Sequence, residues 1–277
     1  MRHSSQEVIA ANIALHTQLA GRYRESEPHY LPENVRHVDG ILRSLRSEAP
    51  GGDLLDLGCG AGFIIDIAKR HFSSIEGIDV TPAMLDLVIL DSDSCRINVQ
   101  VAQVEAVPFQ DRSFDAVTAY ALLHHLAELG PTFREVHRVL RPGGVFYSDL
   151  DPNFYFWEAF NNLDESAARS DFVRRELYAV QHKDQELLAE FGVDPKLLGV
   201  AETLKHEEGG FKEEDLTRML HEAGFSAVSI RYFWFLGEAK VLHGEDPGAA
   251  GAIRDHLVQM LPLSRHLFKY VGIWARK

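Results

Sequence analysis

A strand, a glycine-rich turn and a helix are predicted by one ten-residue stretch, Leu54-Leu-Asp-Leu-Gly-Cys-Gly-Ala-Gly-Phe63. Its leucines form a short apolar run that suits a strand covered on both faces, and the turn follows without a polar spacer. The glycines at positions 58, 60 and 62 remove the Cβ atoms that would disfavour positive φ angles or hold a ligand away from the backbone. A helix is expected over residues 61–71, so its unpaired N–H groups point at whatever the turn binds.

The spacing of these glycines decides between ligands. A dinucleotide-binding turn has the pattern G-x-G-x-x-G, with a pyrophosphate at the helix N-terminus. Here the pattern is D-x-G-x-G-x-G, and Asp56 at the strand end would repel a pyrophosphate but pair with an ammonium group. A second predicted strand, residues 75–79, ends in Asp79, whose carboxylate suits the two hydroxyls of a ribose. The predicted ligand is a nucleoside joined to an amino acid.

Four further segments follow the turn at matching spacings, and together they resemble the class I S-adenosylmethionine-dependent methyltransferases. They are Gly77-Ile-Asp-Val-Thr-Pro-Ala-Met84, Glu105-Ala-Val-Pro-Phe109 with Ser113-Phe-Asp115, Leu122-Leu-His-His-Leu126, and Glu135-x-x-Arg-Val-Leu-Arg-Pro-Gly-Gly144. The resemblance covers residues 50–235. It implies an α/β fold: a Rossmann-like sheet of seven mostly parallel strands, whose last strand is antiparallel and inserts between the fifth and sixth. A Rossmann-like sheet that binds another nucleotide, or none, is the alternative.

The resemblance also implies which residues hold the cofactor, S-adenosylmethionine. Asp79 would hold the ribose, Tyr120 would border the transferred methyl group, and the glycine turn would accommodate the methionine end. Where the family usually has an Asp that accepts from the adenine amino group, this chain has Gln103, whose amide oxygen could accept without the charge. Met84 either flanks the adenine or is ordinary helix core. The expected cofactor-binding residues are Asp56, Gly58, Gly60, Gly62, Asp79, Val80, Met84, Gln103, Val104 and Tyr120.

Candidates for the reaction follow the fourth predicted strand, because ligands in parallel sheets collect at the carboxyl ends of strands. Tyr120 and His125 are the catalytic candidates, and a histidine has the right intrinsic pKa to remove a proton near neutral pH. The alternative is that His125 only packs at the following helix. Acceptor-side candidates are Tyr23, His29, Asp149, Asp151, Tyr155, Trp157 and His206. Residues 149, 151 and 153 could supply oxygen ligands for Mg²⁺, but this interpretation is less favoured because their spacing suits a turn equally well. No bound metal is expected.

Three parts are expected along the chain. Residues 1–50 form an N-terminal helical cap, residues 51–153 and 206–277 the cofactor-binding core, and residues 154–205 a helical lid inserted after the fifth strand. Within them, a helix is expected over residues 5–24 and a loop over residues 245–251.

Composition limits the partners of the chain. Its 277 residues carry a formal net charge of −13, which argues against non-specific binding to a phosphate backbone. The two cysteines, Cys59 and Cys95, supply neither a disulfide framework nor a cysteine metal cluster, which favours the cytoplasm. An apolar signal segment and long apolar runs are missing from the sequence, so a soluble protein with no membrane partner is expected. A monomer and a homodimer both stay open.

The expected function is direct methyl transfer from S-adenosylmethionine to a small-molecule acceptor. This displacement depends above all on the collinear placement of nucleophile, methyl carbon and sulfur, so no dedicated base is required. The aromatic lid and the acidic surface favour a small metabolite over RNA, DNA or protein. Two alternatives stay open: a cofactor-binding protein without catalysis, which Gln103 suggests, and a methyltransferase that acts on a macromolecule.

Overall fold

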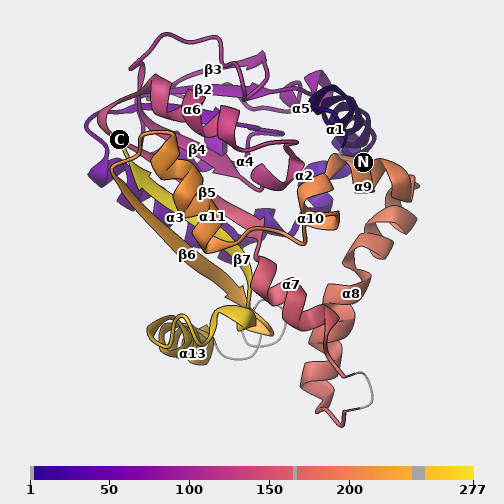
Figure 1. Cartoon of the computed structure of the whole chain (residues 1–277). Coiled ribbons are helices and arrows are strands. Elements are labelled where there is room, and N and C mark those ends of the chain that lie inside the picture. Colours follow the sequence, from indigo (N-terminus) through magenta and orange to yellow (C-terminus); the bar gives the residue numbers. More distant parts are fainter. Residues whose placement is uncertain (1–2, 165–166, 239–246) are drawn as a thin grey trace.

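A single seven-stranded sheet forms the centre of the computed structural model (Figure 1), which describes residues 3–164, 167–238 and 247–277. The strand order is β3-β2-β1-β4-β5-β7-β6. The strands are β1 Asp53–Leu57, β2 Ser74–Asp79, β3 Arg96–Val101, β4 Phe114–Tyr120, β5 Leu140–Pro152, β6 Ala227–Phe235 and β7 Phe268–Arg276.

Strand β7 is the one antiparallel strand, and it lies between β5 and β6. All other neighbouring pairs are parallel. The predicted Rossmann-like sheet, with its last strand antiparallel and inserted between the fifth and sixth, is therefore confirmed. As in other parallel sheets, the carboxyl ends of β1, β2 and β4 meet at one edge, where ligands collect.

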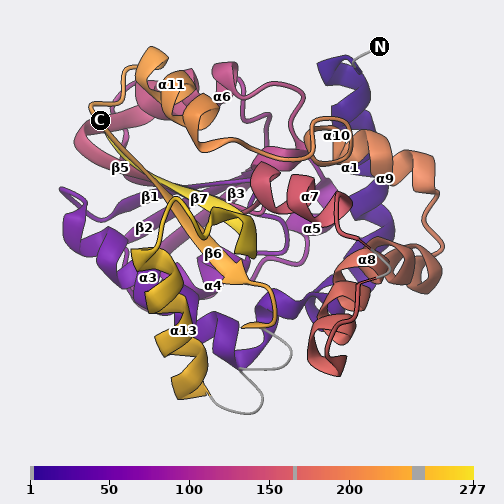
Figure 2. The same cartoon turned by 60° about the horizontal axis from the view of Figure 1, so that its bottom comes forward.

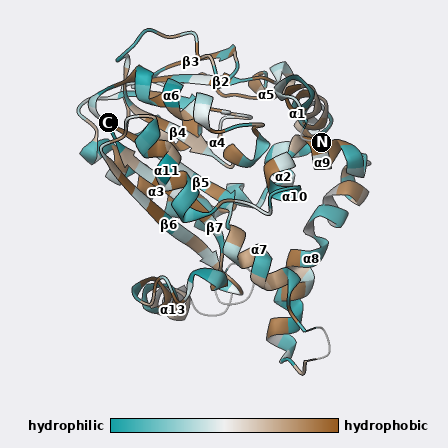
Figure 3. Cartoon of the chain, viewed as in Figure 1, coloured by the Kyte–Doolittle hydropathy of each residue, from teal (hydrophilic) through white to brown (hydrophobic). Residues whose placement is uncertain are grey.

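Both faces of the sheet are covered by helices, so most residues of the central strands are apolar, and the buried polar residues among them include Asp56 of β1 and Thr118 of β4. Leu54 faces a cluster with α3 Pro32–Glu48 and α4 Phe63–Ala68, while the next residue, Leu55, faces a cluster with α6 Gly130–Val139 and α11 Glu213–Glu222. This alternation is the two-residue period of a strand. Figure 3 shows the contrast in hydropathy between these strands and the outward faces of α6 and α11.

Helix α1 and the segment after β5 lie together beyond the carboxyl edge (Figure 2). Helix α1 packs on α9 through an apolar cluster that includes Leu15, Leu19 and Leu198. Helix α8 extends away from the sheet (Figure 1). The elements of this region are α1 Ser5–Leu19, α2 Tyr23–Ser26, α5 Pro82–Leu85, the 3-10 helix η3 Leu123–His125, α7 Phe154–Asn161, α8 Asp171–Phe191, α9 Pro195–Ala201 and α10 Thr203–His206.

Two local expectations were wrong. The helix expected over residues 5–24 ends at Leu19, and a 3-10 turn separates it from α2. The loop expected over residues 245–251 is partly helical, because α13 Pro247–Gln259 starts at a proline, which is favourable at a first helical position; residues 245 and 246 lie outside the described residues. Among the described helices, none is long and apolar enough to cross a bilayer.

Asn12 connects three separate parts of the chain. Its buried Nδ2 lies 3.0 Å from the Val8 carbonyl oxygen in α1, 3.0 Å from that of His125 and 3.1 Å from that of Ala201. This amide therefore links α1, η3 and α9 to one another. Without the amide, the buried carbonyl oxygens would lack a donor and the free-energy cost of their desolvation would remain.

Replacement of Asn12 by alanine should lower the free energy of unfolding by about 1–3 kcal/mol, because buried carbonyl oxygens lose their donor. Urea denaturation followed by circular dichroism measures the change. Thr17→Ala is the matched control, since Thr17 is exposed on the same helix and bonds only within it, to Ile13. Equal unfolding midpoints for Asn12→Ala and the control would contradict this role for the amide.

Candidate cofactor site

A pocket opens at the carboxyl ends of β1 and β4, against the glycine turn. Three parts of the chain line it: the turn after β1, the end of β4, and the segment between α1 and α3. The lining residues are Tyr23, His29, Tyr30, Asp56, Gly58, Cys59, Gly60, Ala61, Phe63, Ile64, Tyr120 and Ala121. Six of the predicted site residues therefore meet at one place: Tyr23, His29, Asp56, Gly58, Gly60 and Tyr120.

The turn needs glycine for space as well as for conformation. Gly58 has a φ of +60°, and a Cβ atom there would lie 2.4 Å from Cδ1 of Leu122. Any side chain at position 58 would clash with the side chain of Leu122, which would have to move. The pocket wall at this point is consequently bare backbone, which a ligand can approach closely.

Asp79 fixes the shape of the turn from the neighbouring strand. Its Oδ2 accepts from the Gly60 N–H at 2.9 Å, and its Oδ1 accepts from the Thr81 N–H at 2.8 Å. The Asp79 side chain is absent from the pocket lining, but each carboxylate oxygen has a second lone pair and can accept another donor.

Asp56 is a buried carboxylate with one unused oxygen. Oδ1 accepts from the Thr118 hydroxyl at 2.7 Å, whereas Oδ2 has no hydrogen-bond partner among the described residues. Burial raises the pKa of Asp56 to about 7; the Thr118 bond opposes this rise and the charge of Asp79 adds to it. A positively charged donor at Oδ2 would restore the carboxylate, so the site fits a ligand that carries an ammonium group.

Aromatic rings close the pocket on the side of the N-terminal segment. The ring of Phe63 packs 4.7 Å from that of His29, 5.0 Å from Tyr120 and 5.2 Å from Tyr30, between centroids. The hydroxyl of Tyr30 is buried and also lacks a partner among the described residues. Phe63 was not predicted, although its place as the first residue of α4 after the glycine turn was a usable signal.

Arg24 holds the N-terminal segment on the turn. Its Nη2 donates to the Ala61 carbonyl oxygen at 2.5 Å, and its Nη1 pairs with Asp66 of α4 at 2.9 Å. The segment that lines the pocket is thus anchored to the same turn that it covers.

The residues expected around the adenine do not line this pocket. Met84 is buried in a small cluster with Ala20 and Ala61, and Val104 is buried in the core on the α6 face. The backbone carbonyl oxygen of Gln103 accepts from the Ala106 N–H at 3.4 Å. Gly62 and Val80 are likewise absent from the lining.

The two catalytic candidates have different surroundings. Tyr120 lines the pocket, and burial, reinforced by the charge of Asp149, raises the pKa of its phenol well above the usual range, so it stays protonated. His125 lies outside the lining, and its Nδ1 donates to the Ala201 carbonyl oxygen at 3.2 Å. Burial and the neighbouring histidines hold the pKa of His125 well below 6.5, so this ring is neutral.

The remaining acceptor-side candidates do not converge on the pocket. Asp149 accepts from the Tyr147 hydroxyl at 2.7 Å, and burial raises its pKa to about 7. Asp151 accepts from both the backbone N–H and Nδ1 of His124. The Tyr155 hydroxyl bonds Glu214, and Trp157 stacks edge-on against its helical neighbours.

The side chains of residues 149, 151 and 153 make hydrogen bonds to different partners. Asn153 donates to the carbonyl oxygens of Arg265 and Phe268 and caps α7, while Asp149 and Asp151 have the separate partners given above. These separate partners do not favour the magnesium interpretation, although Oδ2 of Asp151 is buried without a hydrogen-bond partner among the described residues.

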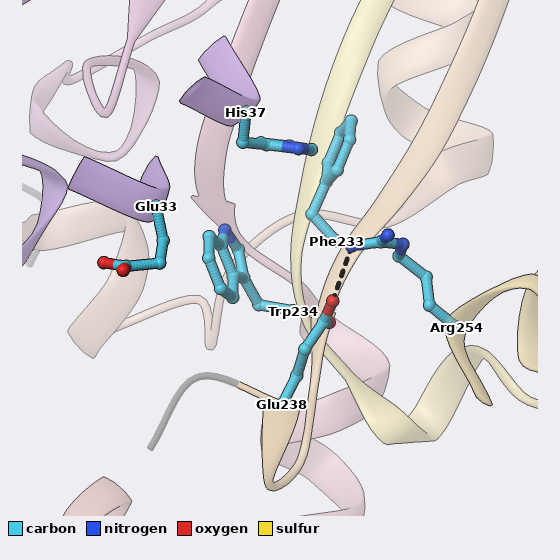
Figure 4. A pocket seen from close by; sticks show the side chains of 6 residues that line it. All are labelled: Glu33, His37, Phe233, Trp234, Glu238 and Arg254. Atoms are coloured by element: carbon cyan, nitrogen blue, oxygen red, sulfur yellow. Dashed lines mark hydrogen bonds and ion pairs between the residues drawn. The ribbon is translucent and has the colours of Figure 1, made fainter. Parts of the chain in front are cut away.

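A second pocket lies between α3, the end of β6 and α13 (Figure 4). It is lined by Glu33, His37, Phe233, Trp234, Glu238 and Arg254. The buried carboxylate of Glu238 pairs with Arg254 at 2.7 Å and accepts from the Phe235 N–H at 3.0 Å. No motif marked these residues, since they come together only through packing.

Comparisons with known proteins agree with this geometry. Residues 55–148 match the family model of the methyltransferase domain. Over 103 residues the chain is 39% identical to a ubiquinone/menaquinone biosynthesis C-methyltransferase of Geotalea daltonii, covering 35% of this chain and 44% of that protein. Over 153 residues it is 29% identical to a ubiquinone biosynthesis O-methyltransferase of Pseudomonas syringae pv. tomato, covering 53% and 65%.

A solved structure shares the fold across almost the whole chain. It is a phosphoethanolamine N-methyltransferase 2 of Haemonchus contortus in complex with phosphomonomethylethanolamine and S-adenosylhomocysteine, with a TM-score of 0.58 and 14% identity, covering 99% of this chain and 60% of that chain. The two curated relatives are spanned over only 44% and 65% of their own lengths. The sheet order, the glycine turn with its two acids and the matching family model agree: residues 55–148 carry a methyltransferase domain, within a sheet that has the class I methyltransferase fold.

Proposed function

We propose that this chain transfers the methyl group of S-adenosylmethionine to a small-molecule acceptor. One observation carries the proposal: three features meet at one pocket, namely a buried Asp56 oxygen without a hydrogen-bond partner in the described part of the chain, the backbone of the glycine turn and the ring of Tyr120. When bound, the cofactor supplies an electrophilic methyl group on a positively charged sulfur. The chain's contribution is to hold the reactants in line, and positioning alone can contribute on the order of 7–11 kcal/mol.

Each part of the pocket has a proposed task. Asp56 pairs with the ammonium group, Asp79 accepts from the ribose hydroxyls while bracing Gly60, and Tyr120 borders the methyl group. A phenol that stays protonated can orient a reactant but does not act as a base near neutral pH. For His125 we favour positioning over proton removal, because it lies outside the pocket lining and is bonded to the lid.

A flat or apolar small acceptor suits the walls of the pocket. Aromatic rings from α4, β4 and the N-terminal segment border it, and aromatic walls favour such ligands. The net charge of −13 disfavours a nucleic acid. The relatives named for ubiquinone and menaquinone biosynthesis support acceptors of this chemical class.

Two other functions are discriminated by experiment. A cofactor-binding protein without catalysis is suggested by Gln103, which stands where the family usually has an Asp and is not among the lining residues, and turnover on any acceptor would dismiss this alternative. A methyltransferase for macromolecules would place label in protein or nucleic acid fractions.

We also propose the division into a cap over residues 1–50, a lid over residues 154–205 and a core between and after them.

Replacing Asp79 by alanine should weaken binding of S-adenosylmethionine at least 100-fold, because both the ribose contact and the brace on Gly60 are lost. Isothermal titration calorimetry measures the affinity. Glu76→Ala is the control, since Glu76 lies on the same strand and bonds Asn98 of β3 at 2.8 Å, away from the turn. Wild-type affinity in Asp79→Ala would refute the assignment.

Binding of S-adenosylmethionine should weaken as the pH falls through about 7. The free Asp56 carboxyl, with its pKa raised to about 7, takes up a proton below that pH, whereas ammonium binding requires the charged form. The dissociation constant should rise by up to about tenfold per pH unit below pH 7. In Asp56→Asn the affinity should be low and this dependence absent; the wild-type slope in that variant would rule Asp56 out as its source.

Methyl transfer is measured with label. Radiolabelled S-adenosylmethionine is incubated with the protein and, in parallel, with cell extract fractionated by mass and with hydroxylated quinone precursors. Label should appear in a low-mass product and fall to background with Asp79→Ala. Label confined to macromolecules would overturn the acceptor class, and absence of label despite measured cofactor binding would favour the non-catalytic alternative.

A further inference from the structure

We propose that His124, His125 and Glu202 form a binding site for one divalent transition-metal ion, of which Zn²⁺ is the representative. One donor atom from each of these side chains lies within 4.8 Å of the other two. The histidines belong to η3, just after β4, and Glu202 joins α9 to α10 in the lid. None of the three lines the cofactor pocket, so the site is separate from the methyl-transfer chemistry.

Hydrogen bonds to the far ring nitrogens orient both imidazoles. Nδ1 of His124 donates to Oδ1 of Asp151 at 2.9 Å, and Nδ1 of His125 donates to the Ala201 carbonyl oxygen at 3.2 Å. A carbonyl oxygen only accepts, so Nδ1 of His125 carries the proton and Nε2 carries the lone pair. Metal-ligating histidines in proteins characteristically bond a carboxylate or a backbone carbonyl through the other ring nitrogen, as both do here.

Glu202 supplies the charge that a divalent ion needs. Its side chain is largely buried, and its contacts with Lys205 at 2.5 Å and His206 at 3.4 Å both use Oε2. Among the described residues, Oε1 is thus the oxygen without an ion pair. Two histidines and one carboxylate are an established ligand set for zinc, with a fourth position open.

A neighbouring cluster competes for the same glutamate but fits a metal less well. Asp184, Glu202 and His206 also bring their donor atoms within 4.8 Å of one another. Nζ of Lys205 already lies 3.0 Å from Asp184 and 2.5 Å from Glu202, so an ammonium group occupies the place of a cation there. The two rings of the histidine pair are instead oriented by Asp151 and by the Ala201 carbonyl oxygen.

Metal binding would draw the lid toward the core. Tetrahedral ligands about 2.0–2.1 Å from zinc lie roughly 3.3 Å apart, so the donors must close by up to about 1.5 Å. The movable partner is Glu202, at the junction of two short helices, while η3 is held by Asp151 and Asn12. The ion would fix the lid against the segment that follows β4.

The experiment uses the full chain freed of metal by a chelator. Isothermal titration with Zn²⁺ should give one site per chain, and His125→Gln or Glu202→Gln should weaken it at least tenfold. His206→Gln is the matched control and should bind as the wild type does, because it belongs only to the neighbouring cluster. Asp151→Asn should weaken binding about 10–100-fold through misorientation of His124.

Two readouts keep the test independent of folding defects. Circular dichroism of each metal-free variant shows whether it is folded, and Co²⁺ added to the wild-type chain should give the strong visible absorption of a four-coordinate site. Loss of binding in His206→Gln would assign the ion to the neighbouring cluster instead. Zinc bound equally by all variants, or no zinc bound by the wild-type chain, would overturn the proposal.

Discussion

Two backbone N–H groups converge on the carboxylate of Asp79, and the shape of the cofactor edge depends on this contact. Gly60 donates to one oxygen and Thr81 to the other, while the Cys59 N–H donates to the Ile78 carbonyl oxygen at 2.9 Å. The end of β2 therefore defines the path of the turn that follows β1. Because the turn forms one wall of the pocket, an acid that reads in sequence as a ligand for ribose is also part of the scaffold.

The same edge concentrates negative charge at a buried point. Asp56 and Asp79 stand at the ends of neighbouring strands, and the second carboxylate adds to the burial that raises the pKa of the first. Such a pair is costly unless a cation joins it, which is the physical basis for expecting a ligand with an ammonium group. Oδ2 of Asp56, which has no hydrogen-bond partner among the described residues, is the atom at which such a cation would bind.

Segments outside the central sheet complete the site and connect to each other. Arg24 anchors the N-terminal segment on the glycine turn, and Asn12 joins α1 to η3 and α9. Helices α1 and α9 and the 3-10 helix η3 after β4 consequently meet in one polar region that contains His125. A shift of α9 would alter the pocket wall, because α9 packs on α1 and only the 3-10 turn of residues 20–22 separates α1 from Tyr23, which lines the pocket.

The sequence by itself determined the first strand, the glycine turn and the two acids, because strand periodicity, glycine spacing and residue type are local properties that a chain displays before it folds. The seven-stranded sheet with its antiparallel last strand was implied only by the resemblance to the methyltransferase family. The sequence also predicted Tyr23, His29 and Tyr120 as site residues, and these three belong to the aromatic wall of the pocket. Only the tertiary structure decided that Phe63 joins that wall, that Met84 and Val104 pack into the interior, and that His125 faces the lid. Those outcomes depend on which distant residues compete for the same space and the same hydrogen bonds, and no local pattern encodes them.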